Sequence, residues 1–367
     1  MFFGLLAIDD HPCCKMQEVV EAFFLNSINS NAFSLALFPD WIQATLSNSN
    51  CTLAAKFLSV HALLHAQGVT SGVRIAIYKQ LQATNRVENL CDGSADLPDD
   101  CVDWNSALGE AIIALMKSLY DSLDLAVFRR PGELGQPTHQ FYVEFIEKNK
   151  YVCPFCGIHK FKNSLGASRE DFDHYLHKSD YPLAAANMKN LFPTCGICNQ
   201  DYKKTKDILA DGAAFYPYST IPEIKIEVNC ETYPVKGKTK NKGRWSVKLE
   251  LVQPDPVTGL KIKAWKRVYS IKERLENEIS QFCEDWIIRL FDDLPRPLAQ
   301  DEFIALIASA KIKAINSSQR RMEAGEIIKA AFFDFMLSRA KHSFVESFRI
   351  LQNKKSVASN RTNNPGQ

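Results

Sequence analysis

Two Cys-x-x-Cys pairs constrain this chain more strongly than any other feature of its sequence. Cys153 and Cys156 form the first pair, and Cys195 and Cys198 form the second. A two-residue gap lets both thiolates of a tight turn face one ion, so two such turns complete a tetrahedral site. We therefore predict a structural zinc ion held by the four cysteines. The 38 residues between the pairs exceed the usual zinc-ribbon loop, so this segment must have a structure of its own.

A spaced set of polar residues lies between the pairs and just after them. Asp173 and His174 are adjacent, Asn190 follows the histidine by sixteen positions, and Asn199 comes directly after the second pair. In this pattern residues 148–210 resemble the HNH endonuclease family. The ββα-metal motif of that family combines an Asp-His dipeptide, a middle Asn and a final Asn or His, commonly between Cys-x-x-Cys pairs.

The resemblance implies a role for each matching residue. His174 would be the general base that deprotonates a water molecule for attack on a phosphodiester, which suits an imidazole near neutral pH. Asn190 would orient this histidine through the loop backbone. Asp173 and Asn199 would hold one catalytic Mg²⁺ or Mn²⁺ ion, since hard cations prefer oxygen ligands. Basic residues expected on a following helix and in a later turn would hold the nucleic-acid backbone: Lys203, Lys204, Lys206, Lys238, Lys240, Lys242 and Arg244.

One position departs from the family pattern. Many relatives have proline three residues after the histidine, where this chain has His177. A solvated loop histidine is a simpler interpretation of His177 than a spare base or metal ligand. The wider context, Asp-His-Tyr-x-x-Lys-Ser-x-Tyr-Pro followed by Asn-Leu-Phe and Cys-x-x-Cys-Asn, also resembles HNH effectors of bacterial anti-phage systems, including the nuclease subunit of Septu-type defence. That likeness implies an ATPase partner, and the sequence has no Walker-type loop.

The charge distribution favours a polyanionic partner. Residues 1–127 contain fourteen Asp and Glu against six Lys and Arg, whereas the remaining 240 residues contain 28 acids and 38 bases. The basic part therefore includes the HNH-like segment, which favours a nucleic-acid partner. The resemblance implies DNA as the substrate and does not exclude RNA. The competing interpretation is a zinc-dependent module that binds nucleic acid or protein without turnover. The acidic part could regulate the nuclease, dock a partner or pair with a second copy.

Composition points to a cytoplasmic protein without a membrane segment. The first ten residues have no basic region and include Asp9 and Asp10, so we expect neither a signal peptide nor a membrane anchor. The eleven cysteines are odd in number, and the seven outside the two pairs are scattered. They indicate reduced, mostly buried thiols.

The expected fold is α+β and mainly helical. We predict an acidic helical domain, a linker, an HNH core of the ββα-metal type with zinc knuckles, a small basic β region, C-terminal helices and a disordered tail, over residues 1–128, 129–137, 138–215, 216–268, 269–352 and 353–367. Apolar periodicity predicts helices at 16–30, 40–49, 52–66, 71–83, 105–128, 138–149, 269–292, 299–315 and 321–352. Alternation predicts antiparallel strands at 222–228, 245–252 and 260–265.

Overall fold

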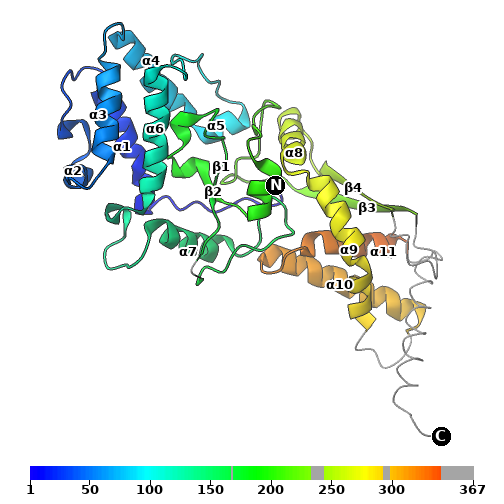
Figure 1. Cartoon of the computed structure of the whole chain (residues 1–367). Coiled ribbons are helices and arrows are strands. Elements are labelled where there is room, and N and C mark those ends of the chain that lie inside the picture. The colour runs from blue at the N-terminus through cyan, green and yellow to red at the C-terminus, as the bar shows by residue number, and fades with distance from the viewer. Residues whose placement is uncertain (167, 233–243, 292–297, 340–367) are drawn as a thin grey trace.

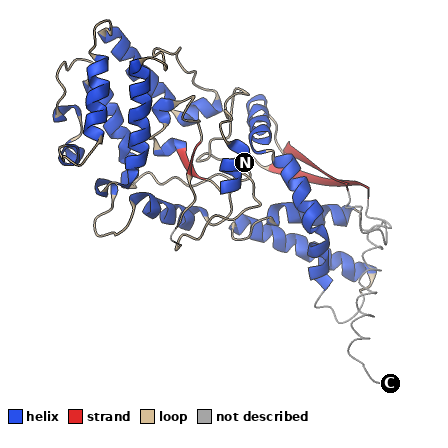
Figure 2. Cartoon of the chain, in the orientation of Figure 1, coloured by secondary structure: helices blue, strands red, loops and turns tan. Residues whose placement is uncertain are grey.

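The computed structural model describes residues 1–166, 168–232, 244–291 and 298–339. The described chain is mainly helical, with two short antiparallel strand pairs (Figure 2). Helices α1 to α6 gather at one end of the molecule and α8 to α11 at the other, and the pair β1 and β2 lies between them (Figure 1). The predicted turn residues Lys238, Lys240 and Lys242 and the predicted tail lie outside the described residues.

The N-terminal part consists of helices whose apolar faces meet around aromatic side chains. The rings of Phe23, Phe38 and Phe57 are buried and lie 4.7–5.6 Å apart between centroids. Two helices begin at capping hydroxyls, because Thr70 and Ser106 accept backbone hydrogen bonds from the first turn. The helices are α1 Met16–Asn26, α2 Asp40–Leu46, α3 Leu53–Leu64, α4 Ser71–Thr84, α5 Val87–Asp92 and α6 Ala107–Asp121. The short helix α5 was not predicted.

The central part has the order helix, strand, strand, helix. Helix α7, Pro137–Asn149, matches the predicted one. Strand β1, Phe172–His174, pairs antiparallel with β2, Leu191–Pro193, so that His174 lies opposite Leu191. A π-helix follows at Ile197–Lys203, where a helix was expected after the second cysteine pair. Short π-helical segments are rare and often occur at functional sites.

The prediction of a third strand after the hairpin was wrong. Strands β3, Ile224–Thr232, and β4, Arg244–Leu251, pair as expected. Residues predicted as a strand at 260–265 instead belong to helix α8, Pro256–Tyr269. Asp255 caps this helix, and Thr258 closes a capping box that the alternation pattern did not take into account. A six-residue pattern is too short to separate a period of 2 from one of 3.6.

Three further helices complete the C-terminal part: α9 Ile271–Phe291, α10 Gln300–Arg320 and α11 Glu326–Ser338. Helix α10 continues through Ser317 and Ser318, which were predicted to separate two helices, and ends where Arg321 adopts a φ of 55°. Residues 340–352 of the predicted last helix lie outside the described residues.

Buried apolar side chains form one continuous cluster from Met1 to Met336. The extended N-terminal residues cross the centre, where Phe2 N donates to Pro154 O at 3.0 Å and Leu5 N donates to Pro217 O at 2.7 Å. Within the described part of the chain, no helix is long and apolar enough to cross a lipid bilayer.

Candidate metal centre and histidine site

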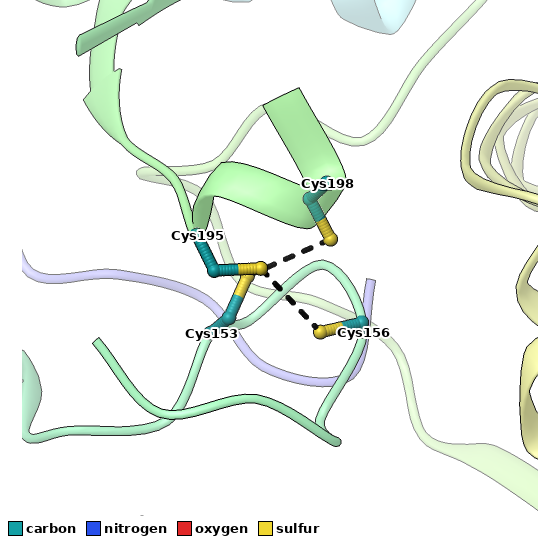
Figure 3. A group of neighbouring side chains, drawn as sticks. All are labelled: Cys153, Cys156, Cys195 and Cys198. Carbon is teal, nitrogen blue, oxygen red and sulfur yellow. Dashed lines mark hydrogen bonds between the residues drawn. The ribbon is translucent and has the colours of Figure 1, made fainter. Parts of the chain in front are cut away.

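The four cysteines of the two pairs meet in one buried cluster (Figure 3). Their Sγ atoms all lie within 4.8 Å of one another. The Sγ distances are 3.9 Å between Cys153 and Cys198 and 4.0 Å between Cys156 and Cys195. Tetrahedral zinc with Zn–S bonds of about 2.3 Å requires sulfur atoms about 3.8 Å apart. The cluster could therefore bind a metal ion such as zinc.

The local backbone structure places the two cysteine pairs opposite each other. After α7 the chain makes a tight turn in which Cys153 N donates to His159 O and Gly157 N donates to Cys153 O, at 3.0 and 2.9 Å. Gly157 has a φ of 67°, a conformation that side chains disfavour. The second pair lies where β2 gives way to the π-helix. Burial raises the pKa of Cys153 and Cys198, so metal binding would have to release their protons.

His174 lies at the end of β1 in a defined tautomer. Its Nε2 is 3.1 Å from the carbonyl oxygen of Ala185. Since a carbonyl only accepts, Nε2 carries the proton and Nδ1 keeps a lone pair. Burial, with help from Lys178 and Lys203, lowers the pKa of His174 to about 4. The imidazole is therefore neutral at pH 7 and has an acceptor nitrogen available.

The N-terminal helices cover this histidine. Tyr120 of α6 places its ring 4.8 Å from the imidazole, measured between centroids, at an angle of 45°. Asn85, just after α4, donates to Leu183 O at 3.0 Å and accepts from the side chain of Asn187 at 2.8 Å. These contacts hold the loop whose Ala185 carbonyl fixes His174. The acidic helical part thus packs directly on the histidine site.

Asn190 is fully buried and binds the loop backbone. Its Oδ1 accepts from Leu176 N at 2.7 Å, and its Nδ2 donates to Leu176 O and Ala184 O at 3.0 and 3.2 Å. Backbone groups on both sides of the loop that follows His174 are thereby joined. Asn190 therefore fixes the shape of this loop, and the orienting role that the family resemblance implies for it stays a prediction.

Asp173 forms a buried ion pair with Lys203. Lys203 Nζ donates to Asp173 Oδ1 at 2.8 Å and to His174 O at 2.6 Å. Burial raises the pKa of Asp173, an effect that Lys203 opposes. Lys203 is 0 % exposed, so the prediction that it contacts a nucleic-acid backbone was wrong. Its charge is used inside the protein because an unpaired buried carboxylate would be costly.

Replacing Lys203 by methionine should destabilise the protein by about 3–5 kcal/mol, because the variant leaves the Asp173 carboxylate buried without its partner. Urea unfolding monitored by circular dichroism measures this change. The double variant Asp173→Asn with Lys203→Met removes both charges and should recover much of the loss. A single variant as stable as the wild type would contradict the buried pair.

Asp173 and Asn199, the residues implied as ligands of a catalytic metal ion, are only partly available to bind one. The contacts of Asp173 go to Lys203, while its buried Oδ2 has no hydrogen-bond partner among the described residues. Asn199 is half-buried in the π-helix. Asp173 therefore keeps one oxygen for a cation, but the neighbouring ammonium group disfavours a second positive charge.

Three other predicted basic residues that the structure describes are on the surface. Lys204 and Lys206 are exposed, and Lys206 Nζ donates to Val268 O at 3.2 Å. Arg244 is exposed and lies 3.6 Å from Glu231. His177 is half-buried, with its Nδ1 accepting from Ser179 N at 3.4 Å and lying 4.0 Å from Asp180. These contacts keep His177 within its own loop.

Two residues at these sites were not found from the sequence. The ring of Tyr120 contacts that of His174 from a helix far away in the chain, and no sequence pattern connects the two. Arg274 of α9 contacts the cysteine cluster. A signal for Arg274 did exist, because it lies on the helix face that carries Ile271 and Leu275, both fully buried. A charged residue beside such an apolar stripe indicates a buried partner.

Comparisons of the chain with protein-family models, with curated proteins and with solved structures gave no match.

Proposed function

We propose that this protein is an HNH-type endonuclease that hydrolyses phosphodiester bonds of DNA and uses its four cysteines to bind a structural zinc ion. The observation that carries the proposal is the presentation of His174. The imidazole lies at the end of a strand, is held in one tautomer by Ala185 O, and has its Nδ1 lone pair free to accept a proton.

In the proposed reaction, His174 Nδ1 takes a proton from a water molecule whose oxygen attacks the phosphorus. The bond between phosphorus and the leaving sugar oxygen breaks, and solvent protonates that oxygen. Asn190 keeps the loop after the histidine closed, so the imidazole stays oriented throughout. The exposed Lys204 and Lys206 lie close in sequence to Asn199 and could bind backbone phosphates.

A divalent ion, Mg²⁺ or Mn²⁺, remains part of the proposal through Asp173 Oδ2 and the amide of Asn199. Such an ion would neutralise negative charge on the phosphate. Because Lys203 already holds the other oxygen of Asp173, metal binding there requires the ammonium group to shift or to tolerate a nearby cation. We expect cleavage to need millimolar Mg²⁺ or Mn²⁺ and to stop in the presence of a chelator.

The deciding experiment is nicking of supercoiled plasmid by purified protein, analysed on agarose gels with and without Mg²⁺ or Mn²⁺. Single-stranded DNA and RNA assayed in parallel identify the substrate. The alternative function is a zinc-dependent binding module without turnover. The burial of Asp173 and the coverage of His174 favour that alternative. Nucleic-acid binding without cleavage under every metal condition would support it.

The covering of His174 suggests control by the N-terminal helices. A base with a pKa near 4 accepts protons poorly at pH 7, and the Tyr120 ring packed against it restricts access by a phosphate. Activation would then require α6 to move, for example when a partner such as an ATPase or the DNA binds. A role in cytoplasmic anti-phage defence would be compatible with such control.

Tyr120→Ala should raise the cleavage rate of the isolated protein several-fold, because it uncovers His174 without removing a residue of the proposed chemistry. Initial nicking rates at fixed metal concentration measure the effect. Tyr78→Ala on α4 is the control, since Tyr78 is half-buried and its hydroxyl contacts only Gln82 in the described hydrogen bonds. A rate unchanged or lowered by Tyr120→Ala would rule out masking by this ring.

A further inference from the structure

Arg274 of helix α9 lies inside the protein against the cysteine cluster. Only 5 % of its surface is exposed. One guanidinium nitrogen, Nη1, donates to Cys198 Sγ at 3.2 Å and to Tyr269 O at 3.4 Å. The guanidinium carbon also lies 4.3 Å from the ring centroid of Tyr202, in the same π-helix as Cys198. The arginine therefore donates a hydrogen bond to one proposed metal ligand, Cys198, and lies over the ring of Tyr202 in the same element.

Arg274 is not fully paired by carboxylates. Glu278, one turn further along α9, interacts with it electrostatically, but no ion pair joins the two among the described residues, and the buried Nη2 of Arg274 has no hydrogen-bond partner there. Arginine stays charged at physiological pH, and a buried charge without a close partner is strongly unfavourable. A further negative charge next to the guanidinium group would therefore stabilise it.

The cysteine cluster can supply that charge. Four thiolates around one Zn²⁺ ion carry a net charge of −2, which is itself costly to bury without a counter-charge. A guanidinium group donating to one of the sulfurs reduces that charge and stabilises the thiolate form. Each group thus explains the burial of the other.

We propose that Arg274 is the buried counter-charge of a zinc–tetrathiolate centre and that it slows the loss of the metal. This inference rests on the zinc ion of the proposed function. Arg274 acts as a positioning residue, because it holds Cys198 and Tyr202 and binds no substrate.

Other contacts from the C-terminal part surround the same centre. Trp265 Nε1 of α8 donates to Phe155 O at 2.8 Å, and Gly325 N, just before α11, donates to Gly157 O at 2.8 Å. Both acceptors belong to the turn that carries Cys153 and Cys156. The elements before and after α9 in the chain are therefore bound to the turn of the first cysteine pair, while Arg274 of α9 contacts Cys198 of the second.

The test is the rate of zinc release from the full-length protein to a colorimetric chelator, preceded by elemental analysis of zinc content. Arg274→Met keeps much of the side-chain volume and removes the charge. We expect this variant to release zinc about 10-fold faster than the wild type or more, within the range known for residues that support metal ligands. Arg267→Met is the matched control, because Arg267 is 37 % exposed on α8 and pairs with Asp211. It should release zinc at the wild-type rate.

The outcomes separate the two proposals. Wild-type protein purified without zinc, and unable to take it up, would defeat the zinc centre and this inference with it. Zinc-loaded wild type and Arg274→Met with equal release rates would overturn the role of Arg274 alone. If Arg274→Met does not fold, Arg274→Gln decides the question. Glutamine removes the charge but keeps a polar group that can donate a hydrogen bond, so its zinc release rate should still exceed that of the wild type, and equality would overturn the proposal.

Discussion

Replacing His174 by alanine should lower the rate of DNA cleavage by about two to four orders of magnitude, the usual contribution of a general base. The variant removes the Nδ1 lone pair that the structure leaves available beside the Ala185 contact. Zinc content and DNA affinity should stay close to those of the wild type, because His174 belongs to neither the cysteine cluster nor the exposed basic surface. Nicking assays, elemental analysis and a binding titration measure these three quantities.

His177→Ala is the matched control for that result. His177 lies three residues away and is also half-buried, but its ring nitrogen contacts its own loop. We expect this variant to retain most of the activity. A His174→Ala protein that cuts DNA at the wild-type rate would exclude the proposed mechanism. Equal losses in both variants would instead indicate that the loop, and not the base, had been damaged.

Replacing Cys195 by serine should abolish stoichiometric zinc binding and lower the free energy of unfolding by at least about 3 kcal/mol, because the binding energy of a structural zinc is folding energy. The damage should spread beyond the two turns, since α8, the residue before α11 and the N-terminal residue Phe2 all bind to the first of them. Elemental analysis gives the zinc content, and denaturant unfolding gives the stability. Nuclease activity should fall as a consequence.

Cys283→Ser is the control for a cysteine effect unrelated to metal. Cys283 of α9 is 8 % exposed and lies outside the cluster. This variant should keep its zinc and most of its stability. A Cys195→Ser protein with full zinc content would show that the four-cysteine centre has been wrongly identified.

The sequence was a good guide where a local pattern controls the structure. Helices α1 to α4, α7 and α9 begin or end within a few residues of their predicted positions, because apolar periodicity and capping residues act over short distances. The paired cysteines likewise pointed to a common cluster. The prediction failed at α8, where the Asp255 capping box outweighed a short alternating pattern.

Part of the histidine site could not be predicted from local sequence patterns. The positions of Asp173, His174 and Asn190 on neighbouring elements follow from the spacing of the motif. That Lys203 turns inward to Asp173 could not be foreseen, because a lysine on a helix is normally solvated and only the packing around it reveals its burial. The coverage of His174 by Tyr120 depends on contacts between segments separated by more than fifty residues.

The sequence alone therefore determined most of the helices, the four-cysteine cluster and the residues that the HNH proposal uses. Only the tertiary structure decided which charges are buried and what lies over each reactive group. The physical reason is that periodicity, capping and ligand spacing are properties of adjacent residues. Desolvation, by contrast, depends on every element packed around a side chain. The burial of Lys203 and Arg274 and the lowered pKa of His174 result from such packing, which no local sequence pattern predicts.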